Sequence, residues 1–114
     1  MIKNNGEGTL EIRNFPNGKG EILLLHRFSQ EEMFDKCSFC AEIFFAPGQS
    51  MGYHKHEKDM EIVYVLSGEI VYSQDDGSER TIYPGSMAIV GAGQGHGMRN
   101  DSNKDAKVLS IVFD

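Results

Sequence analysis

Short apolar segments interrupted by turn sequences recur along the chain, and this rhythm limits the fold more than any other feature. The chain contains three turn signals, at Pro47-Gly48, Asp75-Asp76-Gly77 and Pro84-Gly85. The pair Asp76-Gly77 is typical of a hairpin. Strands with turns at about 8–12-residue spacing are typical of all-β sandwiches and barrels. From the middle of the chain onward, the expected strands cover 40–46, a segment through 54–56, 61–66, 70–73, 81–83, 87–90, 96–100 and 108–113.

The first third of the chain has a weaker pattern. Residues 21–28 form an apolar run that predicts a strand, and alternation at 9–13 predicts an edge strand. Ser29 and Glu32 have the spacing of a capping box, which predicts a short helix. With 114 residues the chain is long enough for one domain only, which we divide into an N-terminal arm, 1–35, and a barrel, 36–114.

Charge and hydropathy exclude several partners. The net charge is -6 and no run of Lys or Arg occurs, so we expect no binding to nucleic acid or to an anionic membrane. The segment after Met1 has no apolar signal core, and no segment approaches the ~18 apolar residues of a membrane span. We therefore expect a cytoplasmic location.

Cys37 and Cys40 form a single Cys-x-x-Cys pair. A structural zinc site needs four ligands, and a second such pair is absent. A thioredoxin-like motif needs a βαβ context, which the strand pattern does not provide. The interpretation is two reduced thiols at the start of a strand.

One cluster carries the chemistry. His54 and His56 are two residues apart, so on a strand both imidazoles point to the same face. Glu61 begins the next strand and is expected to face them across a pair of neighbouring strands. His96 begins a late strand and is expected to contribute from the opposite sheet.

Three imidazoles and one carboxylate are suitable ligands for one divalent transition metal, with iron, manganese, nickel, cobalt, copper and zinc all open. On an octahedral ion these four ligands leave two adjacent positions for water, dioxygen or a chelating ligand. With zinc the same four could instead close a tetrahedron and give an inert site.

The spacing of these residues resembles the two sequence motifs of the cupin superfamily. The first motif is matched at every defined position, by Gly48, His54, His56, Glu61 and Gly68. The second is matched by Gly85, Gly93, His96 and Asn100, but Gly91 stands where the motif has proline. That departure lies in a turn rather than at a ligand, and we expect a looser loop before His96.

The resemblance implies a double-stranded β-helix, a small jelly-roll barrel with the metal inside one end. It also implies a homodimer in which the N-terminal strands contact or exchange with the partner. Cupins of this RmlC-like architecture serve as dioxygenases, decarboxylases, isomerases and non-catalytic binding proteins, so the fold does not decide the reaction.

Pocket residues beyond the ligands are harder to predict. Tyr53, Gln94, Met98 and Asn100 flank the ligands and are candidates to line the pocket, with Asn100 favoured as a brace for the turn after His96. No clear second acid or base accompanies the metal, as lyases usually require. The nearest candidates are Tyr53, Glu42, Tyr83 and His26.

Three functions remain open from the sequence. The first is a metal-dependent enzyme acting on a small oxygen-bearing metabolite, with dioxygenase chemistry ranked slightly above decarboxylase or isomerase chemistry. The second is a non-catalytic, metal-loaded barrel that binds a sugar or an organic acid. The third is a structural zinc site, which would unfold on chelation.

Overall fold

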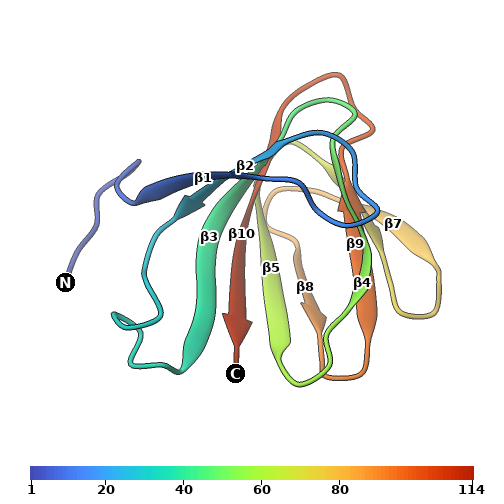
Figure 1. Cartoon of the computed structure of the whole chain (residues 1–114). Helices are drawn as coiled ribbons and strands as arrows, with labels where there is room; N and C mark the ends of the chain where they lie inside the picture. Colours follow the sequence, from blue (N-terminus) through green and yellow to red (C-terminus); the bar gives the residue numbers. More distant parts are fainter.

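The computed structural model describes residues 1–114 and is built from strands and turns without any helix. Ten strands form two antiparallel sheets that face each other (Figure 1). This is the all-β, double-stranded β-helix that the sequence predicts. The strands are β1 Thr9–Arg13, β2 Ile22–His26, β3 Cys37–Phe45, β4 Ser50–Lys55, β5 Met60–Ser67, β6 Ile70–Ser73, β7 Glu79–Ile82, β8 Met87–Val90, β9 Gly95–Arg99 and β10 Ala106–Phe113.

The two sheets differ in size. The larger has six strands in the order β1-β2-β3-β10-β5-β8, and the smaller has four in the order β4-β9-β6-β7. The predicted hairpin around Asp76 is confirmed, because it joins β6 to β7 and is closed by a hydrogen bond from the Gln74 amide to the Ser78 carbonyl. Gly77 in this turn has a positive φ of 84°, which glycine adopts without strain.

The core lies between the sheets and is made by alternate residues of the strands. Val63 and Val65, which share a face of β5 with Glu61, are fully buried there. The core cluster comprises Ile22, Leu24, Ile43, Phe45, Met51, Val63, Val65, Ile70, Tyr72, Met98, Ala106 and Val108. Burying each large aliphatic side chain contributes about 1.5–3 kcal/mol, so this core dominates the stability of the fold.

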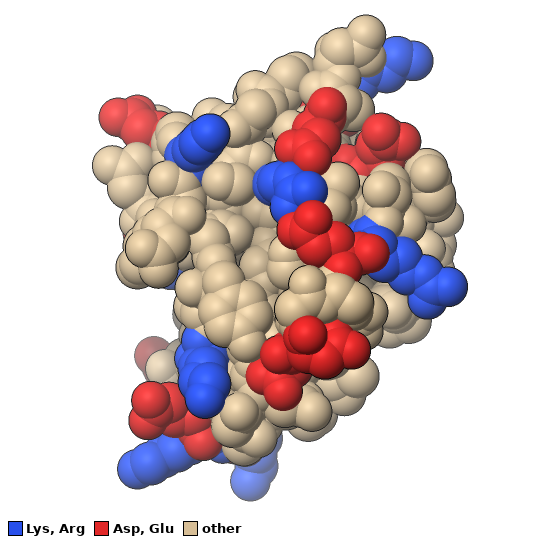
Figure 2. All heavy atoms as spheres, turned by 90° about the vertical axis from the view of Figure 1, so that its right-hand side faces the viewer, with Lys and Arg blue, Asp and Glu red and all other residues tan.

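The outer faces of the two sheets have opposite character. On the larger sheet, Ile12 lies opposite Leu23, and Tyr64 lies opposite Met87, all at least one-third exposed. On the smaller sheet, Arg99 forms ion pairs with Glu79 and Asp101. Figure 2 views the molecule from the side of the smaller sheet and shows acidic and basic side chains interspersed, with no basic patch on that face.

The N-terminal arm belongs to the same fold. β1 is the edge strand predicted for 9–13, and the chain after it crosses the end of the barrel to reach β4 (Figure 1). There the amide of Lys19 donates to the carbonyl of Ser50, and the Ser50 amide donates back. A Cβ at Gly52 would lie 2.3 Å from the Asn17 carbonyl, so only glycine allows this close crossing.

The predicted helix after Ser29 is wrong. The capping box does form, because the Ser29 amide donates to Glu32 and the Glu32 amide donates to the Ser29 hydroxyl. However, Phe34 and Asp35 adopt positive φ angles of 56° and 57°, which turn the chain back before a helix can continue. The segment 30–35 is therefore a series of turns that leads into β3.

Both cysteines lie in the first half of β3, so their expected place at the start of a strand is confirmed. Cys37 opens β3, and both Cys37 and Cys40 are buried and free. The chain contains no helix that is long and apolar enough to cross a membrane.

Candidate metal centre

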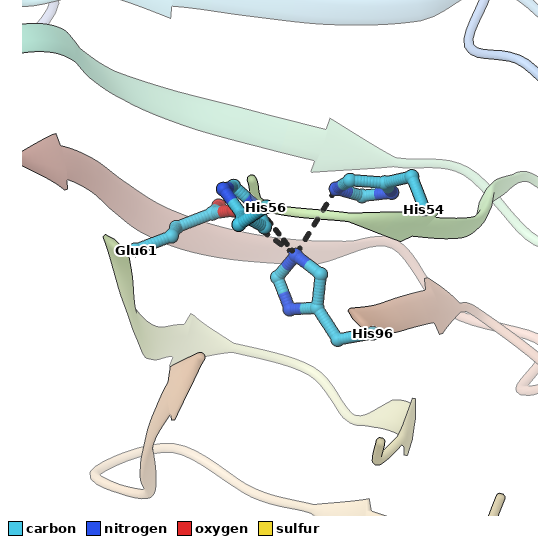
Figure 3. Close-up of side chains that lie close together, drawn as sticks. All are labelled: His54, His56, Glu61 and His96. Atoms are coloured by element: carbon cyan, nitrogen blue, oxygen red, sulfur yellow. Dashed lines mark hydrogen bonds and ion pairs between the residues drawn. The ribbon is translucent and has the colours of Figure 1, made fainter. Parts of the chain in front are cut away.

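Four side chains converge inside one end of the barrel (Figure 3). His54 lies on β4, His56 directly after it, Glu61 on β5 and His96 on β9. One ligand atom from each lies within 4.8 Å of the other three. His56, Glu61 and His96 are buried, and His54 is partly exposed, so this cluster could hold one ion that is reached from the side of His54.

The sheets contribute these residues in a different way from the sequence prediction. β4 pairs with β9, which places His54 directly opposite His96 in the smaller sheet. Glu61, expected on a strand beside the histidines, comes from the larger sheet across the barrel. The linker of residues 57–59 carries the chain between the sheets instead of forming a hairpin, so the roles of Glu61 and His96 are exchanged.

The spacing of the ligand atoms fits a transition metal. His96 Nε2 lies 3.1 Å from His54 Nε2 and 3.2 Å from His56 Nε2. Glu61 Oε1 lies 3.0 Å from both His56 Nε2 and His96 Nε2. Two ligand atoms about 2.1 Å from one ion are roughly 3.0 Å apart at right angles and roughly 3.4 Å apart at the tetrahedral angle. These four separations are compatible with side chains that would hold one transition ion.

The electrostatics of the cluster also call for a cation. Burial would raise the pKa of Glu61, but hydrogen bonds from His56, His96 and Ser110 outweigh it and hold this pKa at about 2. The hydrogen bond to Glu61 raises the pKa of His56, whereas burial lowers the pKa of His54. A buried carboxylate thus lies among imidazoles, and either a proton or a metal ion must balance its charge.

Each ligand is held by a partner outside the cluster. His54 Nδ1 lies 2.8 Å from the Gly52 carbonyl, and His56 Nδ1 lies 2.7 Å from Asp59 Oδ1. His96 Nδ1 lies 2.6 Å from the hydroxyl of Tyr72, and the Ser110 hydroxyl donates to Glu61. When Nδ1 donates in this way, the lone pair of Nε2 points at the centre of the cluster, as metal binding requires.

A cavity of about 350 Å³ opens onto the cluster. This is at the lower end of the range for small-molecule sites. Its wall includes the side chain of Arg13, and Asp59 is its one acid besides Glu61. The lining residues are Arg13, Phe15, Ser38, Phe39, Ile43, Met51, His54, His56, Asp59, Glu61 and Val112.

None of the four predicted pocket residues lines this cavity. The Tyr53 hydroxyl lies near Asp75, and Met98 is part of the core. Gln94 accepts a hydrogen bond from the Gly91 amide and thereby closes the loop that lacks the motif proline. Asn100 donates to the carbonyls of Phe45 and Lys104 and so braces the turn after β9.

The other acid–base candidates also lie elsewhere. Glu42 is on the outer face of the larger sheet, where it pairs with Arg27 and Lys107. His26 pairs with Glu11 at 2.7 Å, and the side chain of Tyr83 is exposed. None of the acid–base candidates named from the sequence therefore lines the cavity.

Sequence reasoning missed several residues that shape the site. Asp59 could have been found, because an acid three residues after His56 can reach back to its imidazole. Tyr72, Ser110 and Arg13 carry no local signal, since they approach the cluster from strands far away in the sequence.

Comparisons with known proteins agree with this architecture. The family described as Cupin domain matches residues 41–112. A protein of Thermotoga maritima named oxalate-binding protein is 36% identical over 99% of this chain and 93% of its own length. A crystal structure from the same species, described as a predicted oxalate decarboxylase, has 34% identity and a TM-score of 0.93, covering 99% of this chain and 98% of that one.

A more distant structure shares the fold alone. The polyketide cyclase RemF of Streptomyces resistomycificus has 23% identity and a TM-score of 0.80, covering 99% of this chain and 80% of its own. The same barrel thus serves proteins with different names, so the residues of the cavity must distinguish among functions.

Proposed function

The chain belongs to the cupin domain family, and on this premise we propose that it is a metal-dependent binding protein for a small dicarboxylate of the oxalate class. The observation that carries the proposal is a set of four converging ligands, three of which line a small cavity whose wall also includes Arg13. The name of the Thermotoga maritima relative, oxalate-binding protein, agrees with this choice of ligand.

His54, His56, Glu61 and His96 would hold one divalent transition ion. When bound, the ion supplies a Lewis acid with open positions for two oxygens of a chelating anion. Three neutral imidazoles and one carboxylate leave a local charge of about +1, which favours an anion over a neutral sugar. The side chains of Phe15, Phe39 and Val112 line the cavity and keep part of it apolar.

Binding without turnover is favoured because the cavity has no uncommitted proton donor. Decarboxylation of oxalate releases CO2 and takes up one proton to give formate, so it needs such a donor. Asp59 is the one acid of the cavity outside the ligand set, and its carboxylate accepts from His56. Its place in the wall supports decarboxylation as a second candidate function, in which Asp59 would have to release His56 to deliver the proton.

The test begins with elemental analysis of protein purified without added metal, followed by calorimetric titration of the manganese-loaded protein with oxalate. We expect about one metal ion per chain, saturable binding of oxalate, and loss of both metal and oxalate binding in His54→Ala. Acetate, which cannot chelate through two groups, serves as the control ligand. No binding of oxalate to the loaded protein would refute the proposal. Formate released from oxalate would move the assignment to the decarboxylase.

We also propose that two copies of the chain pair through the outer face of the larger sheet. An antiparallel sheet with one exposed face normally carries polar residues there, yet Tyr64, Met87 and Ile89 are apolar and at least one-third exposed. Sedimentation of the wild-type protein should give a dimer. The double variant Met87→Lys, Ile89→Lys should be a monomer, whereas the control variant Thr81→Lys on the smaller sheet should remain a dimer. A monomeric wild-type protein would exclude this pairing.

A further inference from the structure

The N-terminal arm places one basic side chain in the wall of the cavity. Arg13 is the last residue of β1, and β1 pairs only with β2 at the edge of the larger sheet. On β1, Thr9, Glu11 and Arg13 share the face that continues the inner face of the sheet, since Glu11 pairs with the core residue Leu24. Arg13 therefore lies on the inner face, and it lines the same cavity as His54, His56 and Glu61.

The guanidinium of Arg13 is held in place before any ligand binds. Its Nε and Nη2 donate to Glu11 Oε2 and Oε1 at 3.0 and 2.8 Å, and Glu11 Oε1 also lies 2.7 Å from His26 Nε2. The guanidinium carbon lies 5.5 Å from the ring centre of Phe15 and 5.9 Å from that of Phe39. Two aromatic rings that also line the cavity thus flank the guanidinium and restrict its rotation.

One edge of this guanidinium has no protein partner. The hydrogen bonds to Glu11 use Nε and Nη2, and Nη1 makes no hydrogen bond within the protein. Arginine has five N–H donors in a planar fork that matches carboxylate oxygens. The donors of Nη1 therefore remain available for a ligand in the cavity.

The chemistry of a chelating dicarboxylate matches this edge. An oxalate that uses one oxygen of each carboxylate for the metal keeps two oxygens, which point away from the ion in one plane. Glycolate also chelates, through its hydroxyl and one carboxylate oxygen, but it keeps only one outer oxygen. A planar donor opposite the ion thus distinguishes two ligands of nearly equal size.

We propose that Arg13 is the specificity-determining residue of the cavity, and that its guanidinium binds the carboxylate oxygens of a dicarboxylate that the metal leaves free. This inference rests on the proposed function, since it assumes that a chelating anion occupies the metal. The barrel strands then supply the metal ligands, and the N-terminal arm supplies the selection of the anion.

The test measures oxalate and glycolate binding by calorimetry on manganese-loaded wild type, Arg13→Gln, Arg13→Lys and Arg80→Gln. Arg80 is an exposed arginine on β7 outside the cavity, so Arg80→Gln controls for the change in net charge. We expect Arg13→Gln to weaken oxalate binding about 10- to 100-fold and glycolate binding much less. Arg13→Lys, which keeps the charge but not the fork, should recover part of the oxalate affinity.

Metal content and thermal unfolding of each variant separate this role from a structural one. Because the side chain of Arg13 is 41% exposed, we expect Arg13→Gln to fold and to bind one metal ion as the wild type does. Equal loss of oxalate and glycolate affinity, or a loss that Arg80→Gln reproduces, would overturn the role of Arg13. Wild-type protein that binds metal but not oxalate would instead overturn the proposed function, and the role of Arg13 with it.

Discussion

Replacing Tyr72 by Phe removes a single oxygen atom and tests how strongly a buried hydroxyl governs metal binding. Tyr72 is 5% exposed, and its hydroxyl lies 2.6 Å from His96 Nδ1. Burial raises the pKa of Tyr72, so the hydroxyl stays protonated across the physiological range. It can therefore donate to a bare Nδ1 or accept from a protonated one.

The magnitude follows from the tautomer of His96. Without metal, Nε2 can carry the hydrogen and donate to Glu61 Oε1 at 3.0 Å, while Nδ1 accepts from Tyr72. With metal on Nε2, Nδ1 must carry the hydrogen, and in Tyr72→Phe this buried donor has no partner. An unsatisfied buried donor costs about 1–3 kcal/mol, which corresponds to a roughly 5- to 150-fold loss of metal affinity. Outer partners of metal-bound histidines typically have effects of this size.

The assay is a metal titration against a chromophoric chelator of known affinity. Tyr64→Phe is the matched control, because Tyr64 lies on the outer face of the larger sheet and its hydroxyl makes no hydrogen bond within the protein. We expect Tyr64→Phe to bind metal as the wild type does. If Tyr72→Phe also binds metal with unchanged affinity while remaining folded, the hydrogen bond to His96 does not tune the site.

Three further predictions concern stability. Adding manganese at about 100 times its Kd should stabilise the protein by about 2.7 kcal/mol in a thermal melt. Protein from which a chelator has removed the metal should remain folded, because the hydrophobic core contains none of the four metal ligands. Gly68→Ala should destabilise far more than Gly85→Ala in urea unfolding, because both residues have positive φ but only the Cβ at 68 meets backbone, 2.5 Å from the Asp105 carbonyl oxygen. Burial raises the pKa of Glu42, but Arg27 and Lys107 outweigh it and hold this pKa below its ordinary 4.5, so stability present above pH 4.5 should be lost as pH falls below it. Glu42→Gln should flatten that loss, and an unchanged pH profile would contradict this reasoning.

The strands and the ligand set could be predicted because their signals are local. The apolar runs and turn residues predicted nearly every strand to within a few residues, and period two aligned His54 with His56. The helix after Ser29 was predicted wrongly, since a capping box describes only the first turn. The helix does not form because the chain must return to β3 within a short distance. The Arg27 amide donates to the Cys40 carbonyl and so holds the two ends of this segment together.

The assembly of the site depended on contacts that no local pattern encodes. A linker as short as residues 57–59 fits either a hairpin or a crossing between sheets, so the sheet that carries Glu61 could not be read from the sequence. The same holds for Arg13, whose place depends on the pairing of β1 with β2 at the edge of the larger sheet. The metal ligands could therefore be predicted from the sequence, whereas the other residues that line the cavity were identified only in the structure.

The place of β10 has a consequence for the order in which the molecule can form. β10 follows all the other strands in the chain, yet it lies between β3 and β5 in the middle of the larger sheet and pairs with both. During synthesis, two earlier strands must wait with open edges until residues 106–113 leave the ribosome, and such long-range pairing is slow. Ser110 on this strand holds the carboxylate of Glu61, so a nascent chain cannot complete its metal centre before its central strand is in place.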